Sequence, residues 1–434
     1  MKAKNKLGLV FFPAFDWAIS PTHPEREERL LYTKDQLFEE GIEDIEGIEL
    51  FRPDIATEKD IQRVHFCVPD VLSRVTKSHM VSIGGAIKAF DLVFNKEVDK
   101  SFALVRPPGH HAHKVVYGDR GFCIVNIEAV AIEKMRKKYK DLKVAIIDTD
   151  CHHGDGTEDI YYNDKDTLFI SIHQDGRTLF PGTGYTHELG GPGGYGYNIN
   201  IPLPPGTGDE GFLYVLEDVI LPILEEYKPD IIINSAGQDN HYSDPLTMMN
   251  FSAKGYAILN EKLNPHIAVL EGGYSIEGAL PYVNLGIILA MAGLDYSEIT
   301  EPDFSIDKIS QSADVTEYIE KICKIVNENW KNKEKLKEEK FKDLKVYKKE
   351  KQIYYDTDGI LEDQVRYFHV CNNCSGLDII ESRNDSNTKI KAITIPRDSC
   401  PKCLEKGYSE FENIDKKYNH VYLQDKFNDK YLNK

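Results

Sequence analysis

Short runs of almost continuous apolar residues alternate with longer amphipathic stretches over the first 300 residues. The short runs are rich in β-branched residues and are typical of parallel strands that are covered on both faces. They predict strands at Leu7–Phe12, Phe102–Val105, Val144–Ile147, Leu168–Ile172, Ile231–Asn234 and Ile267–Leu270. Helical spacing of apolar residues occurs between them, at Met80–Phe90, Ile124–Tyr139, Asp209–Glu226, Ala253–Leu263 and Ile276–Ala292. The alternation predicts an α/β fold, an open and mostly parallel sheet with helices on both faces.

The pattern changes after Pro302. An apolar stripe predicts an amphipathic helix and consists of Ile319, Ile322, Cys323, Val326 and Trp330. A segment rich in Lys and Glu, residues 331–351, follows the stripe and is typical of a solvated helix or a connector. We therefore predict three parts: an α/β domain at 1–305, a helical Lys/Glu-rich connector at 306–365, and a small cysteine-containing domain at 366–434.

The charge of the chain is unevenly distributed. The 434 residues include 53 basic and 71 acidic ones, for a formal net charge of −18. Residues 301–434 hold 25 basic and 26 acidic residues, so a net charge of −17 belongs to residues 1–300. An acidic domain lacks the basic face that a nucleic-acid binder needs, so direct nucleic-acid binding is not expected. The acidity instead favours basic partners such as Lys-rich segments.

The sequence carries no pattern of a secreted or membrane protein. The segment Met1–Val10 lacks the long apolar core of a signal peptide. The longest apolar runs, such as Leu285–Leu294, are about half of the roughly 20 residues that a membrane span needs. Eight cysteines are too few for a disulfide scaffold. We therefore expect a cytoplasmic protein without a membrane association.

Histidine, aspartate and glycine are concentrated directly after the predicted strands. In an open α/β sheet, ligands bind outside the carboxyl ends of the strands. The segments that follow the strands are RPPGHHAH (106–113), DTDCHHGDG (148–156), HQD (173–175) with FPGTG (180–184), SAGQD (235–239) and EGGY (271–274). These segments therefore predict a functional site at one edge of the sheet.

The Asp-x-Asp-x-His spacing in the second segment predicts a metal site. Residues two apart in an extended segment point the same way, so Asp150 and His152 can reach one point while Asp148 lies just behind. Asp239, after another strand, is the natural third ligand, and such an N/O site with an open position suits Zn²⁺ or another first-row divalent ion. Capping of tight turns by Asp and His is one alternative, and a metal on His173 and Asp175 is another, although it leaves His152 without a role.

Five of these motifs together resemble a known family. RPPGHHA, DTDCHHGDG, LFPGTG, SAGQDNHYSDPL and LEGGY occur in the order of the histone deacetylase and acetylpolyamine amidohydrolase superfamily. The segment His23–Arg29 is similar to the HPE-type loop near the start of that family. The resemblance covers residues 1 to about 300 and implies the arginase–deacetylase fold and a zinc-dependent amidohydrolase.

The resemblance also implies roles for individual residues. The catalytic zinc, for which Fe²⁺ is an alternative, would be held by Asp150, His152 and Asp239. The residues that it implies for catalysis are His110, His111, Tyr274, Asp148 and Asp155. Of the tandem histidines His111 would move the proton, Asp148 and Asp155 would orient the two rings, and Tyr274 would donate to the substrate carbonyl. A K⁺ ion near the zinc loop would involve Ser171.

The substrate implied by the resemblance is an acetylated, or otherwise acylated, lysine in a protein or peptide, with acetate as a product. Gly121, Phe122 and Phe180 would line a narrow channel for the acyl-lysine arm. Leu246 stands where polyamine-selective relatives carry a glutamate, which favours acyl-lysine, and Asp70 is the candidate for a carboxylate at the rim. The alternatives are an acetylpolyamine or other small-amide deacetylase, and a non-catalytic acyl-lysine binder. Gln238 departs from the Phe that is common in the family beside a zinc ligand.

Two Cys-x-x-Cys pairs, 25 residues apart, lie in the last part of the chain: Cys371, Cys374, Cys400 and Cys403. Their spacing is typical of a four-cysteine zinc ribbon and predicts a second, structural Zn²⁺. Two redox pairs are the alternative, but no thioredoxin-like βαβ pattern surrounds them. The family resemblance does not extend to this region. It could dock on the catalytic domain, form a homo-oligomer or bind a protein partner.

Overall fold

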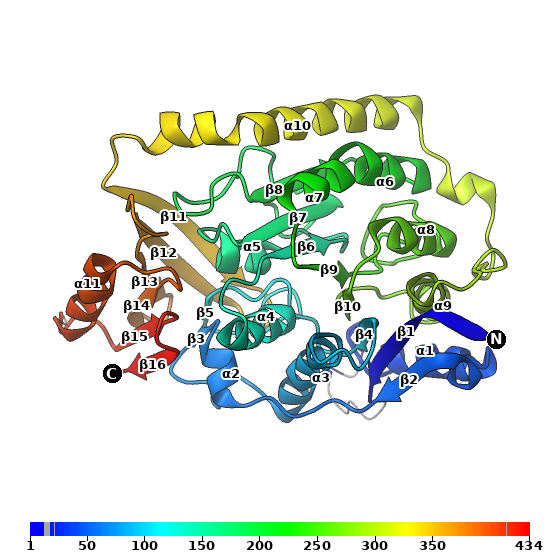
Figure 1. Ribbon diagram of the computed structural model, residues 1–434, viewed down its shortest axis with the longest axis horizontal. Coiled ribbons are helices and arrows are strands. Elements are labelled where there is room, and N and C mark those ends of the chain that lie inside the picture. Colours follow the sequence, from blue (N-terminus) through cyan, green and yellow to red (C-terminus); the bar gives the residue numbers. More distant parts are fainter. Residues whose placement is uncertain (13–17, 21, 414) are drawn as a thin grey trace.

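The computed structural model describes residues 1–12, 18–20, 22–413 and 415–434, and contains two large sheets (Figure 1). The larger sheet has eight strands in the order β2-β1-β4-β10-β9-β6-β7-β8, and each neighbouring pair is parallel. Its strands are β1 (Lys2–Phe11), β2 (Glu46–Phe51), β4 (Lys100–Leu104), β6 (Val144–Asp148), β7 (Thr167–Gln174), β8 (Asn198–Leu203), β9 (Ile231–Ala236) and β10 (Ile267–Leu270). All six predicted strands are confirmed, and the open parallel sheet with them.

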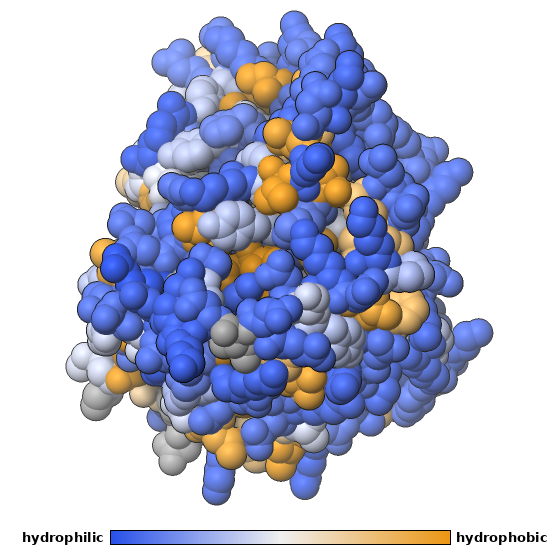
Figure 2. Space-filling model, turned by 90° about the vertical axis from the view of Figure 1, so that its left-hand side faces the viewer, coloured by the Kyte–Doolittle hydropathy of each residue, from blue (hydrophilic) through white to orange (hydrophobic). Residues whose placement is uncertain are grey.

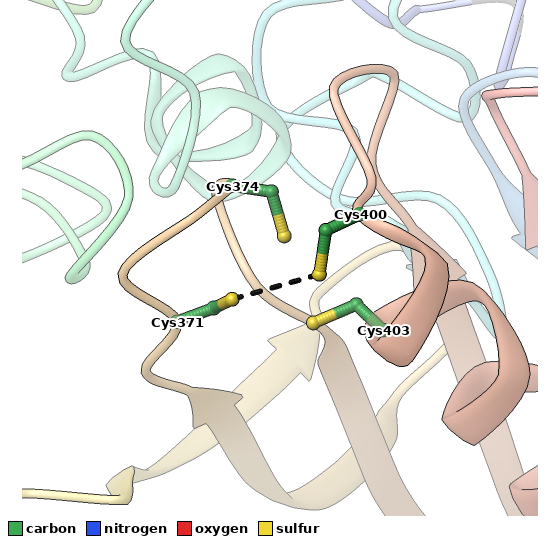
Figure 3. Close-up of side chains that lie close together, drawn as sticks. All are labelled: Cys371, Cys374, Cys400 and Cys403. Atoms are coloured by element: carbon green, nitrogen blue, oxygen red, sulfur yellow. Dashed lines mark hydrogen bonds between the residues drawn. The ribbon is translucent and has the colours of Figure 1, made fainter.

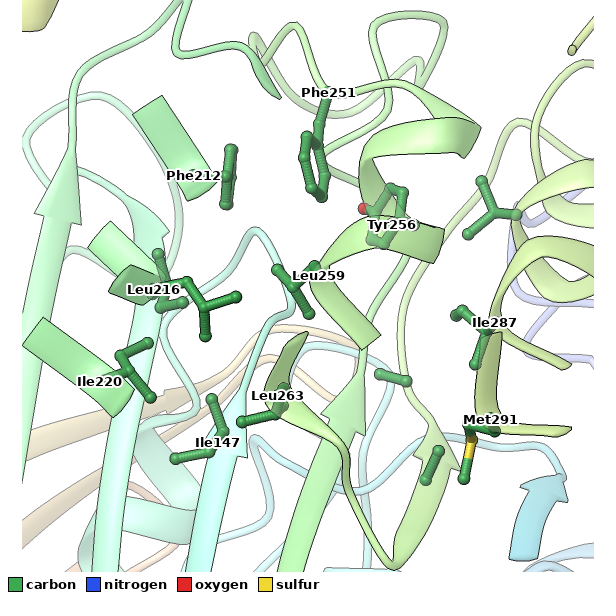
Figure 4. Packing of buried hydrophobic residues seen from close by; sticks show 14 of the residues in the cluster. Ile147, Phe212, Leu216, Ile220, Phe251, Tyr256, Leu259, Leu263, Ile287 and Met291 are labelled. Atoms are coloured by element: carbon green, nitrogen blue, oxygen red, sulfur yellow. The ribbon is translucent and has the colours of Figure 1, made fainter. Parts of the chain in front are cut away.

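Helices cover both faces of this sheet. The longer ones are α1 (Glu28–Glu39), α3 (Lys77–Phe94), α4 (Ile127–Lys138), α8 (Ala253–Leu263) and α9 (Leu280–Ala292). Shorter elements are η1 (Ile42–Asp44), α2 (Glu58–Gln62), α5 (Asp155–Tyr161), η3 (Ile306–Ile309) and the two-strand pair β3 (Phe66–Cys67) and β5 (Val115–Val116). Successive residues of a strand enter different cores. Ile146 packs with the core of α3 and α4, whereas Ile147 packs with the core of α8 and α9, which Figure 4 shows.

The predicted helix at Asp209–Glu226 is interrupted. It consists of α6 (Asp209–Val215), a π-helical turn η2 (Leu216–Ile220) and α7 (Leu221–Tyr227), with Pro222 in the first turn of α7. Proline has no N–H group and its ring displaces the carbonyl four residues before it, which explains the widened turn.

The stripe that follows Pro302 is confirmed as the buried face of α10 (Ala313–Phe341), which lies along the part of the molecule that contains the eight-stranded sheet. All five stripe residues are buried. The predicted helical connector at 306–365 is helical only in its first part, because β11 (Val346–Tyr355) and the start of β12 (Ile360–His369) lie within it. In β11 every second residue faces inward, and these include Lys349 and Lys351, so the alternation of a strand was concealed by lysines.

The C-terminal region is a six-stranded sheet in the order β11-β12-β13-β14-β15-β16, more than a small ribbon. Its remaining strands are β13 (Asp378–Asn384), β14 (Lys389–Ile395), β15 (His420–Asp425) and β16 (Lys430–Asn433), and α11 (Pro401–Glu412) packs on β14 and β15. Only β14 and β15 run parallel among its neighbouring pairs. The boundaries of the three predicted parts stay predictions.

The C-terminal sheet packs against the part that contains the eight-stranded sheet through a shared core and buried charges. Tyr117 packs with Ile353 and Tyr355 of β11. Lys114 Nζ lies 2.6 Å from Asp378 Oδ2, and Arg366 Nη1 lies 2.7 Å from Asp159 Oδ1. On the side of the molecule where this sheet lies, the surface is mostly hydrophilic with scattered apolar patches (Figure 2). No helix among the described residues is long and apolar enough to span a membrane.

Candidate active site

The structure brings the three predicted metal ligands together at the carboxyl ends of β6 and β9. One ligand atom from each of Asp150, His152 and Asp239 lies within 4.8 Å of the others. His152 Nδ1 is 2.9 Å from Asp239 Oδ2 and 3.1 Å from Asp150 Oδ1. Burial lowers the pKa of His152, but the two carboxylates outweigh it and raise that pKa to about 10. The site is therefore strongly anionic and suits a divalent cation.

Backbone amides and two glycines hold the ligand carboxylates in place. Asp150 accepts from the N–H groups of His152 (2.8 Å) and Gly272 (2.7 Å), and Asp239 accepts from the N–H of Cys151 (2.7 Å). A Cβ atom on Gly272 would overlap both carboxylates, and one on Gly237 would overlap Asp150. The glycines of the SAGQD and EGGY segments are thus explained by the close approach of the chain to the ligands.

The tandem histidines lie in the loop after β4, each paired with the predicted carboxylate. His110 Nδ1 is 3.1 Å from Asp148 Oδ2, and His111 Nδ1 is 2.7 Å from Asp155 Oδ1. Burial lowers the pKa of both rings. For His110 the charges of Asp150 and Asp148 outweigh burial and raise its pKa well above the usual value. Burial and then the charge of His110 lower the pKa of His111 to about 3. The surroundings therefore shift the pKa values of the two rings in opposite directions.

Aromatic rings pack on His111 and on Tyr274. The ring of Phe180 meets that of His111 edge-on at 5.1 Å between centroids, and Phe122 meets Tyr274 edge-on at 5.5 Å. Gly121 lies against both His111 and Phe180, where a side chain would overlap them. Tyr274 is 7% exposed, and burial raises its pKa well above the usual value, so its phenol is neutral and can donate.

Ser171 and Leu246 are two further residues that the sequence predicts for the site. The hydroxyl of Ser171 lies 2.9 Å from His173 Nδ1, and a K⁺ ion there stays a prediction. Leu246 is 37% exposed, and its N–H donates to Asp244, which also accepts from Tyr274 N–H.

Two further positions bear on the predicted rim and on the packing near the metal ligands. The carboxylate of Asp70 accepts hydrogen bonds from Ser73. Asp70 also lines a cavity together with Tyr422 of the C-terminal sheet. Its role at the substrate rim stays a prediction. Gln238 is buried and donates to Asn284.

Sequence reasoning missed several buried charges behind the site. Glu271 accepts from the N–H groups of Gly109 (2.7 Å) and His110 (3.1 Å), and burial raises its pKa to about 7. Arg29, fully buried and paired with Glu25, donates to the carbonyl of Gly273 at 2.7 Å. The signal for Glu271 and Arg29 was present, because both lie inside motifs that the resemblance uses.

The four C-terminal cysteines also converge (Figure 3). Cys371 and Cys374 come from the loop after β12, and Cys400 and Cys403 from the start of α11. The sulfurs of Cys371 and Cys400 are 3.8 Å apart, far beyond a disulfide bond. Zn–S bonds of about 2.3 Å in a tetrahedron place sulfurs about 3.8 Å apart, so the spacing fits a zinc ion. A backbone N–H from Cys403 lowers the pKa of Cys400 to about 7, which favours its thiolate, whereas burial raises the pKa values of Cys374 and Cys403.

The site consists of an anionic triad and paired histidines at the edge of a parallel sheet. This arrangement defines a metal-dependent amidohydrolase. The family model "Histone deacetylase domain" matches residues 70–284. A "Probable deacetylase" of Archaeoglobus fulgidus is 46% identical over 324 residues, which cover 68% of this chain and 89% of that protein. The "Acetoin utilization protein AcuC" of Bacillus subtilis is 30% identical, and the match covers 69% of this chain and 85% of that protein. The solved HDA15 HD domain has a TM-score of 0.64 at 26% identity and covers 77% of this chain and 99% of that one.

The chain therefore belongs to the histone deacetylase family. It is a hydrolase that acts on linear amides. The family match ends before the C-terminal cysteines, whose sheet lies beyond it.

Proposed function

We propose that the chain is a zinc-dependent deacylase that removes acetyl or related acyl groups from lysine side chains of proteins or peptides. The observation that carries the proposal is the joint presence of the anionic triad, the two histidines, each paired with a buried carboxylate, and the buried Tyr274. Zinc held by Asp150, His152 and Asp239 would polarise the amide carbonyl and lower the pKa of a water to about 7.

The side chains of this protein supply the proton transfers. His111 Nδ1 faces Asp155, so this nitrogen carries the proton and Nε2 is left as the acceptor. A neutral His111 can take a proton from the attacking water and then deliver it to the amine that leaves. The charged His110 stays paired with Asp148 and stabilises the negative charge that develops beside it.

Tyr274 completes the set by donating to the oxygen of the substrate carbonyl as that oxygen becomes an anion. The rings of Phe122 and Phe180 support an apolar passage for a neutral acyl-lysine arm, and the exposed Leu246 adds no charge to the rim. The products are a carboxylate, such as acetate, and a free amine.

The test compares kcat/KM on a panel of acyl-lysine peptides and acetylated polyamines, with the zinc-loaded full chain. We expect the highest value on an acyl-lysine peptide and a decrease of at least about 100-fold in kcat for Tyr274→Phe. Tyr282→Phe, the same change on α9, serves as the control and should leave kcat unchanged. A higher kcat/KM on acetylpolyamines would replace the proposal with the small-amide alternative. Equal, negligible acetate release by the wild type and Tyr274→Phe would overturn it.

A further inference from the structure

The tip of the β11–β12 hairpin reaches the loop that carries the channel wall. Three consecutive residues of that loop, Asp119, Arg120 and Gly121, donate hydrogen bonds to the hairpin. Asp119 N–H donates to Asp358 Oδ2 at 2.7 Å, and Gly121 N–H donates to Asp356 Oδ1 at 2.8 Å. Between them, Arg120 Nη1 donates to the carbonyl of Tyr354 at 2.6 Å. The hairpin belongs to the C-terminal sheet, outside the matched family region.

The loop 119–122 connects this hairpin to both sides of the reaction site. Arg120 donates from Nε (3.0 Å) and Nη2 (2.6 Å) to Asp155, the carboxylate that orients His111. Phe122 directly follows the held Gly121 and packs on Tyr274. A displacement of this backbone would therefore move the aromatic wall and the partner of His111 together.

The backbone of the loop is one that needs outside support. Gly121 has φ +52°, and Phe122, a bulky residue, has φ +69°. A left-handed conformation is unfavourable for a residue with a side chain, so the surrounding contacts have to hold it. The contact with the hairpin is close, because a Cβ atom on Gly118 would overlap Asp358.

The placement of the acidic side chains is otherwise unfavourable. Burial, and then the charges of Asp356 and Asp358, raise the pKa of Asp119 to about 7. Three carboxylates close together repel one another, and the two hydrogen bonds to backbone N–H groups are what offset that repulsion. The exposed carboxylates of the hairpin thus have a defined acceptor role.

We propose that Asp356 and Asp358 are positioning residues of the active site, which fix the backbone of Asp119 and Gly121 and through it Phe122 and Arg120. The effect on substrate rests on the proposed deacylase function. The effect on the loop does not, and the two can be measured separately.

The first measurement is hydrogen exchange of the loop amides in the full chain, by mass spectrometry of peptides that span 118–123. The double variant Asp356→Ala/Asp358→Ala should exchange at least about 10-fold faster there, because two amides lose their acceptors. Asp356→Asn/Asp358→Asn keeps an acceptor oxygen at both positions and should stay within about threefold of the wild type. Asp363→Ala, an exposed carboxylate of β12 that pairs with Arg383 and Gln352, is the matched control.

The second measurement is steady-state kinetics on an acetyl-lysine peptide with neutral flanking residues. The Ala variant should raise KM about 10-fold with a smaller change in kcat, and the Asn variant should restore KM. Zinc content and the melting temperature should not change. Unchanged exchange in the Ala variant overturns the proposal, and so does faster exchange with unchanged KM. If the Asn variant is as impaired as the Ala variant, the proposal is also overturned, because the negative charge of the two side chains would then matter and their acceptor oxygens would not. A wild type without activity on acyl-lysine refutes only the proposed function, and the exchange result still decides the loop.

Discussion

The two clusters of metal-binding side chains differ in donors, burial and surroundings. The triad Asp150, His152 and Asp239 has three N/O donors, with both aspartates fully buried, and catalytic side chains adjoin it. The cluster of four cysteines, Cys371 to Cys403, has four sulfur donors, is partly exposed and has α11 and strand ends around it. Three protein ligands leave a position for substrate, whereas four thiolates close a zinc site. Under the proposed function, the first cluster would serve the reaction and the second would serve the fold.

Backbone contacts reinforce this distinction. The triad is held by N–H groups from two strand-end loops, those after β6 and β10, so its geometry follows from the sheet before any ion arrives. The cysteines also come from two segments, but the packing between these is small, with Cys403 and Leu377 among its buried members. We therefore expect a preformed catalytic site and a cysteine cluster whose segments depend on the ion.

The largest expected effect is the loss of activity on removing one ligand of the triad. Asp239→Asn keeps the shape of the side chain but removes its charge. Loss of metal assistance of about 4 kcal/mol corresponds to a decrease of about 1,000-fold in kcat. Metal analysis should give one ion per chain in place of two, with little change in the melting temperature. Asp141→Asn, an exposed site, is the control. Two retained ions and normal kcat would contradict the distinction.

The second effect separates stability from chemistry at the cysteines. Cys371→Ser or Cys400→Ser should also remove one ion, but the main consequence should be a loss of several kcal/mol in the free energy of unfolding of the C-terminal sheet. At low temperature kcat should fall less than about 10-fold. Urea unfolding and zinc analysis measure both. Cys323→Ala, buried in α10 and outside the cluster, should keep two ions. A wild type with one ion, unchanged by the Ser variants, would refute the structural zinc.

The same comparison explains what could be predicted from the sequence. His110, His152 and Asp239 were found because strand-end segments of a parallel sheet meet at one edge, and the contiguous motifs carry the spacing. The cysteine pairs were found from their spacing alone. In both cases each motif is a short segment of the sequence, and the fold places the separate motifs close together.

The C-terminal sheet could not be predicted in the same way. Lys351 looks solvated in the sequence, but its ammonium lies 2.6 Å from Asp159 at the interface. Arg120 bridges Asp155 and the carbonyl of Tyr354, which is 234 residues away in the chain. Such pairs depend on how the two sheets pack, and the spacing of residues in the sequence does not indicate the partner of each charged side chain.

The third prediction concerns the interface between the two sheets. Glu133 on α4 is buried between Arg397 (3.2 Å) and Lys426 (2.9 Å) of the C-terminal region and Arg136 (3.0 Å) of its own helix. Burial raises the pKa of Glu133, but the cations outweigh it and lower that pKa to about 2. A pKa that is lower in the folded than in the unfolded state stabilises the fold above about pH 4.5, and this stabilisation is lost as the pH falls towards 2.

Glu133→Gln should therefore be less stable than the wild type at pH 7 by about 3 kcal/mol, and the difference should shrink between pH 5 and pH 3. Urea midpoints of both proteins across this range provide the measurement. Loss of zinc in acid affects both proteins alike, and the exposed Glu225→Gln serves as the reference. A stability difference that is independent of pH would mean that the interface charges do not act through this carboxylate.

The smallest effect is expected at the rim, where a change should alter substrate preference and leave both metal contents at their wild-type values. Leu246 is partly exposed, and its N–H shares Asp244 with the N–H of Tyr274. Leu246→Glu would add an anion near the mouth, and an exposed charge pair contributes up to about 1 kcal/mol, or about fivefold. We expect the ratio of kcat/KM for an acetylated polyamine to that for an acetyl-lysine peptide to rise by this factor at low salt, and to decrease when salt screens the charge. Leu246→Gln has a similar size without the charge, so an equal change in both variants would show that the shape of the rim, and not its charge, sets the preference.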